Sequence, residues 1–233
     1  MSNSKKLLEG KTIVFTGSRK PVEAISHAQS FGANTKYVPL VETIVRQSEK
    51  PDFTEYDWLI FTSRTSAEVF CSFNETVPVK IAAVGTQTAA VLEKHGHQVD
   101  FIPKMFSADQ FIKEFPPVSG KAKCLFIKGQ MAKNTISTMS MQVDEWTVYD
   151  TVLNSENAKT ITQFKDVIIL FASPSAVRAY RQAGGNWSNI QVAAIGHVTK
   201  KAITDNGGTV DFMPERYTYI EVINEIAKGS LSK

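Results

Sequence analysis

Residues 81–115 read IAAVGTQTAAVLEKHGHQVDFIPKMFSADQFIKEF, and residues 192–226 read VAAIGHVTKKAITDNGGTVDFMPERYTYIEVINEI. The two stretches align without a gap from their first residues, 81 and 192, and Gly85 matches Gly196. Each copy predicts a buried strand, a Gly-x-x-Thr turn, a helix, a strand that leads into a proline, and a second helix. Because one domain with a single core has no need of such a duplication, the repeat predicts two similar α/β domains.

The rest of the chain alternates short apolar runs with amphipathic stretches, which is typical of parallel sheets covered by helices. We expect strands at Lys11–Thr16, Asp57–Thr62, Lys80–Val84, Gln98–Phe101, Ala122–Ile127, Asp166–Phe171, Gln191–Ile195 and Thr209–Phe212. We expect helices at Pro21–Phe31, Ser66–Phe73, Gln87–His95, Ala108–Phe115 and Val198–Asn206.

Two segments of β-type residues lie outside the repeat. Residues 37–46 and 145–153 predict a pair of strands that connects the domains. The first domain is then discontinuous and combines residues 1–36 with 154–233, and residues 47–144 form an inserted second domain.

The composition is that of an ordinary globular protein, with 42% hydrophobic and 21% charged residues among 233. We expect order everywhere except at residues 1–6 and 229–233. The net charge of +3 comes without a clustered basic run, which argues against a nucleic-acid partner. No amphipathic seam suggests an oligomer, so we expect a monomer.

Cysteine and histidine usage indicates neither a disulfide nor a metal site. Cys71 and Cys124 are far apart in apolar segments, as core residues in a reducing compartment would be. The four histidines show no paired-ligand spacing. With no signal peptide and no apolar run of ~20 residues, we expect a cytoplasmic protein without membrane contact.

The repeated turns offer groups for anion binding. Gly85 and Gly196 follow buried strands and open helices, where free backbone N–H groups and the helix dipole favour an anion. Thr88 and Thr199 would project hydroxyls from the same first turns. Ser63, Ser173 and the capping-box patterns that begin at Ser107 and Thr218 also mark helix starts. Local capping alone explains these residues as well as capping combined with ligand contact does.

Side chains for nucleophilic or nucleotide chemistry are missing from the sequence. No GxSxG, HExxH, P-loop or GxGxxG pattern is present, and the first strand is followed by Thr16-Gly17-Ser18-Arg19. The available polar side chains include Arg19, Arg64, Lys128, Lys133 and Tyr149. Such groups can bind a polyanion and assist a leaving group, but they do not suit hydride transfer or hydrolysis.

The order of the motifs resembles the uroporphyrinogen-III synthase family. These motifs are FTS (61–63), AAVGxxTAxxL (82–92), FIPxxFSAxxF (101–111), KGQMAK (128–133), VYDT (148–151), FASPSAV (171–177) and AAIGxxTxKAI (193–203). The likeness covers about residues 11 to 227, nearly the whole chain.

The resemblance implies two flavodoxin-like parallel-sheet domains, joined by a two-stranded β connector and separated by a cleft. It implies a cyclising lyase of haem biosynthesis that works without a cofactor or a metal. The substrate is hydroxymethylbilane, a linear tetrapyrrole with eight carboxylates, and the product is uroporphyrinogen III with ring D inverted. Hydroxymethylbilane synthase is a candidate partner for substrate hand-over.

Site residues follow from the matching motifs. Tyr149 matches the family tyrosine that is the best candidate for assisting departure of the substrate hydroxyl. The alternative is a structural tyrosine that is half-buried on a connector strand. The expected substrate-binding residues are Arg19, Thr62, Ser63, Gly85, Thr88, Ser107, Lys128, Gly129, Ser173, Ser175, Gly196 and Thr199. This chain departs from the family pattern at several positions: Arg19 is shifted, Lys128 and Lys133 replace arginines, Ala172 replaces a hydroxyl residue, and Val198 precedes Thr199.

Two other functions remain open at this stage. A non-catalytic protein with two α/β lobes that binds a small anion would also lack nucleophiles, and ligand choice would discriminate it from the synthase. A nucleotide-dependent enzyme on flavodoxin-like lobes is the weaker alternative, because the phosphate-binding fingerprint is missing.

Overall fold

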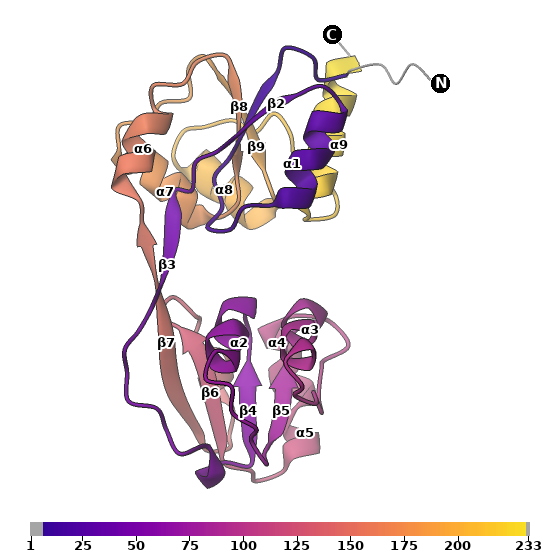
Figure 1. The fold of residues 1–233 in the computed structure, drawn as a ribbon, viewed down its shortest axis with the longest axis vertical. Coiled ribbons are helices and arrows are strands. Elements are labelled where there is room, and N and C mark those ends of the chain that lie inside the picture. The colour runs from indigo at the N-terminus through magenta and orange to yellow at the C-terminus, as the bar shows by residue number, and fades with distance from the viewer. Residues whose placement is uncertain (1–6, 232–233) are drawn as a thin grey trace. The chain divides into compact units, whose positions relative to one another are not determined.

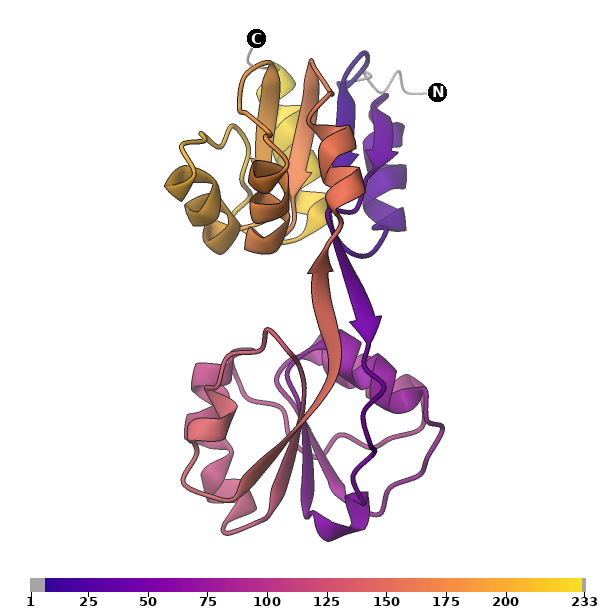
Figure 2. The ribbon, with the colours of Figure 1, turned by 90° about the vertical axis from the view of Figure 1, so that its left-hand side faces the viewer.

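The computed structural model describes residues 7–231 and divides the chain into two compact units. One unit combines Met1–Glu42 with Val152–Lys233, and the other consists of Thr43–Thr151 (Figures 1 and 2). Each unit has a sheet with helices on both faces, and each sheet joins strands that are distant in the sequence. Both units are mixed α/β structures whose sheets consist mainly of parallel strand pairs.

The discontinuous unit has a sheet in the order β2-β1-β8-β9. Its strands are β1 (Thr12–Phe15), β2 (Asn34–Tyr37), β8 (Val167–Phe171) and β9 (Ile190–Ala194). Its helices are α1 (Val22–Ser30), α6 (Ser155–Ile161), α7 (Pro174–Gln182), α8 (His197–Asp205) and α9 (Tyr219–Leu231). Helices α1 and α9 cover one face and α6, α7 and α8 the other, so β1 and β8 are buried between two cores.

The inserted unit repeats this plan. Its sheet has the order β3-β7-β6-β4-β5, with β3 (Val41–Val45), β4 (Trp58–Phe61), β5 (Lys80–Ala83), β6 (Cys124–Gly129) and β7 (Val143–Leu153). Its helices are α2 (Arg64–Cys71), α3 (Thr86–Lys94), α4 (Ala108–Glu114) and α5 (Pro116–Ser119), with short 3₁₀ turns η1 (Phe53–Glu55) and η2 (Ile136–Thr138). Helices α2 and α3 pack on one face, and α4 and η2 on the other.

Strands β3 and β7 are neighbours in the strand order, and both cross the boundary between the units. The Arg46 amide donates to the Val148 carbonyl at 2.9 Å, and the Arg46 guanidinium forms an ion pair with Asp150 at 2.8 Å. The first of the two strands starts later than the sequence suggested. Tyr37 still belongs to β2 in the sheet of the discontinuous unit, and β3 begins only at Val41.

Two expected strands, Gln98–Phe101 and Thr209–Phe212, are absent from the sheets. Each contributes one isolated bridge instead, Phe101 to Ala82 and Phe212 to Ala193. The carboxylate of Asp100 accepts the Ile81 amide at 2.9 Å, and the equivalent Asp211 accepts the Val192 amide at 2.7 Å. Because the aspartate side chains take up these edge amides, no regular ladder extends along β5 and β9.

The expectation of disorder at the end of the chain was wrong for residues 229–231, because α9 continues through Leu231. Gly229 lies against the ring of Phe212, where an added Cβ would approach Cε1 to 2.7 Å. Residues 1–6 and 232–233, for which disorder was also expected, lie outside the described residues.

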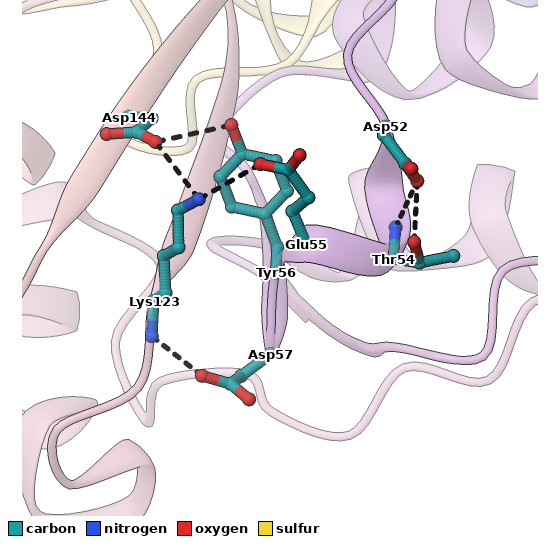
Figure 3. A network of polar contacts seen from close by, with 7 residues as sticks. All are labelled: Asp52, Thr54, Glu55, Tyr56, Asp57, Lys123 and Asp144. Carbon is teal, nitrogen blue, oxygen red and sulfur yellow. Dashed lines mark hydrogen bonds and ion pairs between the residues drawn. The ribbon is translucent and has the colours of Figure 1, made fainter.

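A polar network fixes the amino ends of the inserted unit's strands (Figure 3). Asp57 and Lys123 precede β4 and β6, and their backbones are joined by a hydrogen bond of 2.9 Å. The Lys123 ammonium pairs with Glu55 at 3.3 Å and with Asp144 at 3.9 Å, and Tyr56 donates to Asp144 at 3.2 Å. These charges hold the strand register at the amino edge, whereas the expected site residues lie at the opposite, carboxyl edge.

Candidate functional site at the carboxyl edges of the strands

Serine residues start a helix directly after an interior strand of each sheet. Ser63 follows β4, and its Oγ accepts the Ser66 amide at 3.1 Å. Ser173 follows β8, and its Oγ accepts the Ala176 amide at 3.2 Å. Both serines therefore cap their helices, as the sequence predicted, and both lie at the strand end where open α/β sheets bind ligands.

Glycine residues start the next helix in each unit. Gly85 and Gly196 are the N-cap residues of α3 and α8, and neither helix has a side-chain cap. Thr88 and Thr199 are only 5% and 3% exposed, so most of each side chain is buried in its unit, and contact of their hydroxyls with a ligand stays a prediction. The backbone N–H groups of the first turn are therefore what these two helices offer to an anion.

Tyr149 on β7 meets two of the other expected site residues in the inserted unit. Its hydroxyl lies 3.2 Å from the Oγ of Ser63, within hydrogen-bond distance. Tyr149 is the pairing partner of Gly129, which lies on β6 just after a register shift between Lys128 and Gly129. A Cβ on Gly129 would lie only 2.3 Å from Cζ of Tyr149. The absence of a side chain at position 129 thus makes room for the phenol ring.

The serine caps allow a matched pair of substitutions. We expect Ser63→Ala and Ser173→Ala each to lower the free energy of unfolding by about 1 kcal/mol, because each removes one cap. Ser63→Ala is expected to reduce turnover more, since it also removes the partner of the Tyr149 hydroxyl. Chemical denaturation and initial-rate kinetics on both variants check this, and equal turnover losses would contradict a specific role for the Ser63–Tyr149 contact.

Lys128 lies apart from Tyr149. Its ammonium is buried and pairs with Glu145 at 2.7 Å, and Ser137 donates to the same carboxylate. The ammonium lies 5.6 Å from the ring centre of Phe126, on the sheet face that packs against α4 and η2, whereas Tyr149 packs on the face covered by α2 and α3. Its contact with a substrate carboxylate therefore stays a prediction.

The ion pair makes stability depend on pH. The hydrogen bond from Lys128, followed by that from Ser137, lowers the pKa of Glu145 from its ordinary value of 4.5. A carboxyl group whose pKa is lower in the folded state stabilises the protein at pH values above its pKa in the unfolded state. This contribution is lost as the pH falls through its pKa in the folded state. Because the Glu145 side chain is 35% exposed, solvent screening limits the effect to below about 1 kcal/mol.

Denaturation curves should show this contribution. We expect the unfolding free energy of the wild type to fall more steeply than that of Glu145→Gln as pH drops from about 5 to 3. In a Lys128→Met background, Glu145→Gln should have much less effect on how the unfolding free energy depends on pH. Parallel curves for the wild type and Glu145→Gln would contradict a stabilising ion pair.

The carboxyl edge of the discontinuous unit brings Gly17 against a second tyrosine. An added Cβ on Gly17 would lie 2.2 Å from the hydroxyl of Tyr219 and 3.3 Å from Cβ of Ala172. Burial, and secondly the charge of Tyr37, raise the pKa of Tyr219 to about 12, so the phenol stays protonated at neutral pH. Sequence reasoning missed Tyr219, because the Thr-Tyr-Ile-Glu pattern was interpreted only as a helix start.

The remaining expected residues lie near the same two edges. Arg19 is exposed on the segment after β1, and Thr62 is half-buried between β4 and the cap of α2. Ser175 lies in the first turn of α7, where its Oγ accepts from Arg178 at 3.2 Å. Ser107 caps α4 by accepting the Gln110 amide at 3.2 Å.

Both expected capping boxes are only half formed. The Gln110 side chain donates to Glu114 and does not return to the backbone of Ser107. In the second copy Thr218 accepts the Glu221 amide at 3.2 Å, but the Glu221 carboxylate accepts from Asn224. The side chains prefer partners one turn ahead in the helix.

Residues 7–231 contain both cysteines and all four histidines of the chain. In this part of the chain, no three His, Cys, Asp or Glu side chains come together as a metal site, and no helix is long and apolar enough to cross a membrane. Cys71 and Cys124 are free and buried, and burial raises their pKa to about 11 and about 12. Both thiols therefore stay protonated and act as core residues.

A phenol, hydroxyls and helix N–H groups are thus collected at the two carboxyl edges. The N–H groups can hold carboxylates, and a phenol can donate a hydrogen bond to a leaving oxygen.

A family model described as uroporphyrinogen-III synthase HemD matches residues 23–227. The chain is 27% identical to the uroporphyrinogen-III synthase of Chlorobaculum parvum, over 89% of this chain and 94% of that protein. It is 28% identical to the protein of the same name from Synechococcus elongatus, over 91% and 92% of the two chains.

Solved structures show the same fold. The crystal structure of uroporphyrinogen-III synthetase from Helicobacter pylori superposes with a TM-score of 0.72 at 17% identity, covering 94% of this chain and 99% of the other. A mutant uroporphyrinogen III synthase from Thermus thermophilus gives a TM-score of 0.61 at 13% identity, covering 96% and 99%.

Proposed function

The chain belongs to the uroporphyrinogen-III synthase family, and from this premise we propose how its residues bind and close hydroxymethylbilane. The activity is that of a cyclising lyase in tetrapyrrole biosynthesis. The observation that carries the proposal is the contact of 3.2 Å between the Tyr149 hydroxyl and Ser63, beside Gly129.

Substrate carboxylates are held by helix N-termini at the carboxyl edges. Helices α2, α3, α7 and α8 all begin directly after parallel strands, so each edge carries two positive helix ends. Backbone N–H groups bind a carboxylate without any formal charge. This is how a chain with a net charge of only +3 can bind a ligand with eight carboxylates.

Tyr149 assists the first bond cleavage. Its phenol donates a hydrogen bond to the terminal hydroxyl of hydroxymethylbilane, which leaves as water and gives an azafulvene. Ser63 donates its own hydrogen to the Oγ of Ser66, so its oxygen accepts from the phenol and holds it in place. When substrate binds, Tyr149 exchanges this hydrogen bond for one to the leaving oxygen. The ring D carbon that already carries the chain then attacks, giving a spiro intermediate that fragments and recloses with ring D inverted.

The second step is a task of positioning. Linear substrate closes by itself without inversion, so the enzyme must hold the two chain ends in the less accessible geometry. No step requires a strong base or a transferred electron, which agrees with the collected phenol, hydroxyls and amides.

We further propose that the two units are similar flavodoxin-like domains, joined by a two-stranded connector that β3 and β7 form. The matching strand orders β2-β1-β8-β9 and β7-β6-β4-β5 support this, as does the placement of equivalent helices after equivalent strands. The same proposal includes a cytoplasmic monomer that receives its substrate from hydroxymethylbilane synthase.

The test is to give the purified chain fresh hydroxymethylbilane without added cofactor, oxidise the products and separate the uroporphyrin isomers. We expect mainly the type III isomer. Only type I, the isomer of unassisted closure, from protein shown to be folded would overturn the proposal and favour a non-catalytic protein that binds small anions.

A further inference from the structure

One pair of exposed aromatic residues is duplicated by the internal repeat. Phe106 is 60% exposed and Tyr217 is 51% exposed. The alignment of residues 81–115 with 192–226 places these two at the same position. Among the exposed large hydrophobic residues of the described chain, no other two are related in this way. Because an aromatic residue is exposed at the same position of both units, we expect the two residues to have the same role.

Each aromatic residue is held in place by the same backbone turn. The Ser107 amide donates to the Met105 carbonyl at 2.8 Å, and the Thr218 amide donates to the Arg216 carbonyl at 2.8 Å. Ser107 and Thr218 then cap α4 and α9 through their side-chain oxygens. The ring is therefore carried by a short turn that is fixed on both sides.

Each aromatic residue also lies against the N-cap glycine of a neighbouring helix. A Cβ on Gly85 would lie 3.6 Å from Cβ of Phe106, and a Cβ on Gly196 would lie 2.9 Å from Cγ of Tyr217. The flat apolar group is thus next to the uncapped first turn of α3 in one unit and of α8 in the other. An apolar surface and a set of free amides occur side by side, twice.

Local packing accounts for only part of this arrangement. Tyr217 lies beside His197 in the first turn of α8, with ring centres 5.3 Å apart. A hydrophobic residue just before an N-cap often packs on the residue five positions later, which is Phe111 or Val222 here. Both of these are fully buried, and Phe111 stacks on Phe115 with ring centres 4.7 Å apart. Phe106 and Tyr217 remain more than half exposed, so helix packing leaves most of each side chain in water.

We propose that Phe106 and Tyr217 are substrate-contacting residues that pack against pyrrole rings of hydroxymethylbilane. Each pyrrole is a flat ring that bears carboxylate arms, so it needs an aromatic surface next to an anion-binding helix start. The inference rests on the proposed function and adds ring recognition to carboxylate recognition. The two residues select the tetrapyrrole chain and hold its rings in position for closure.

The test compares Phe106→Ala, Tyr217→Ala and the double variant with the wild type. We expect each single change to raise KM roughly fivefold and the double change to raise it roughly 20-fold, as lost ring stacking does. The type III fraction should fall in the double variant. Tyr217→Phe keeps the ring and should keep a KM near that of the wild type, which separates ring contact from loss of a hydroxyl.

Phe73→Ala is the matched control, because Phe73 is a 41% exposed phenylalanine that packs on Trp146, away from the helix starts. It should leave KM unchanged. A wild type that makes type III product, together with a double variant of unchanged KM and isomer ratio, overturns this inference alone. A folded wild type that makes only type I overturns the proposed function itself, and this inference with it.

Discussion

Tyr149→Phe is expected to lower kcat for type III formation about 100-fold, with KM and thermal stability close to those of the wild type. The change removes only the hydroxyl, which lies 3.2 Å from Ser63 at the carboxyl edge of the inserted unit. The ring stays against Gly129, so packing is retained. What is lost is the hydrogen bond that assists departure of the substrate hydroxyl.

The measurement is initial-rate kinetics with separation of the two isomers, supported by thermal unfolding. Tyr56→Phe is a matched control, because it removes a phenol that donates to Asp144 at the amino edge of the same sheet. That variant should keep its kcat. If Tyr149→Phe retained more than about half of the wild-type kcat, the phenol would have no chemical role and would only fill space.

Much of the fold could be predicted because the internal repeat marks the equivalent strands, turns and helices of the two units. The buried runs at β4 and β8, and the turns that follow them, are periodic and apolar enough to be recognised in the sequence. The strands expected at 98–101 and 209–212 could not be excluded in this way. Their pattern suits a strand, but a carboxylate at Asp100 and Asp211 competes for the edge amides.

The site was harder to predict because its contacts depend on register. Tyr149, Ser63 and Gly129 were each expected from motifs, but no motif shows that they meet. Their meeting depends on the shift in pairing between Lys128 and Gly129, which the sequence does not mark. The same strand turns Lys128 to the other face, where Glu145 neutralises it.

Exposed aromatic residues were overlooked for a different reason, although Phe106 lies within the FIPxxFSAxxF motif. Phe106 and Tyr217 stand at matched positions of the repeat, so the signal was present, but exposure cannot be read from an aromatic residue alone. Tyr219 gives no signal at all, since its hydroxyl meets Gly17 only through the packing of α9 against β1.

Gly129→Ala is expected to reduce kcat about as much as Tyr149→Phe and also to destabilise the fold by about 1–3 kcal/mol. The added Cβ would lie 2.3 Å from Cζ and 2.6 Å from the hydroxyl of Tyr149, so the ring must move away from Ser63. Gly185→Ala is the matched control, because its Cβ would lie 2.5 Å from the ring of Tyr180, a tyrosine outside the expected site. It should lose similar stability but keep its kcat.

The double variant Gly129→Ala/Tyr149→Phe decides whether both changes act on the same hydroxyl. We expect its kcat to lie close to that of Tyr149→Phe alone, because displacing a ring that has no hydroxyl costs no further catalysis. If the fold-losses in kcat of the two single variants multiplied in the double variant, Gly129 would serve the reaction independently of the Tyr149 hydroxyl, through close approach of its backbone to the substrate. A Gly129→Ala variant with the kcat of the wild type would show that the position of the Tyr149 hydroxyl does not limit ring closure.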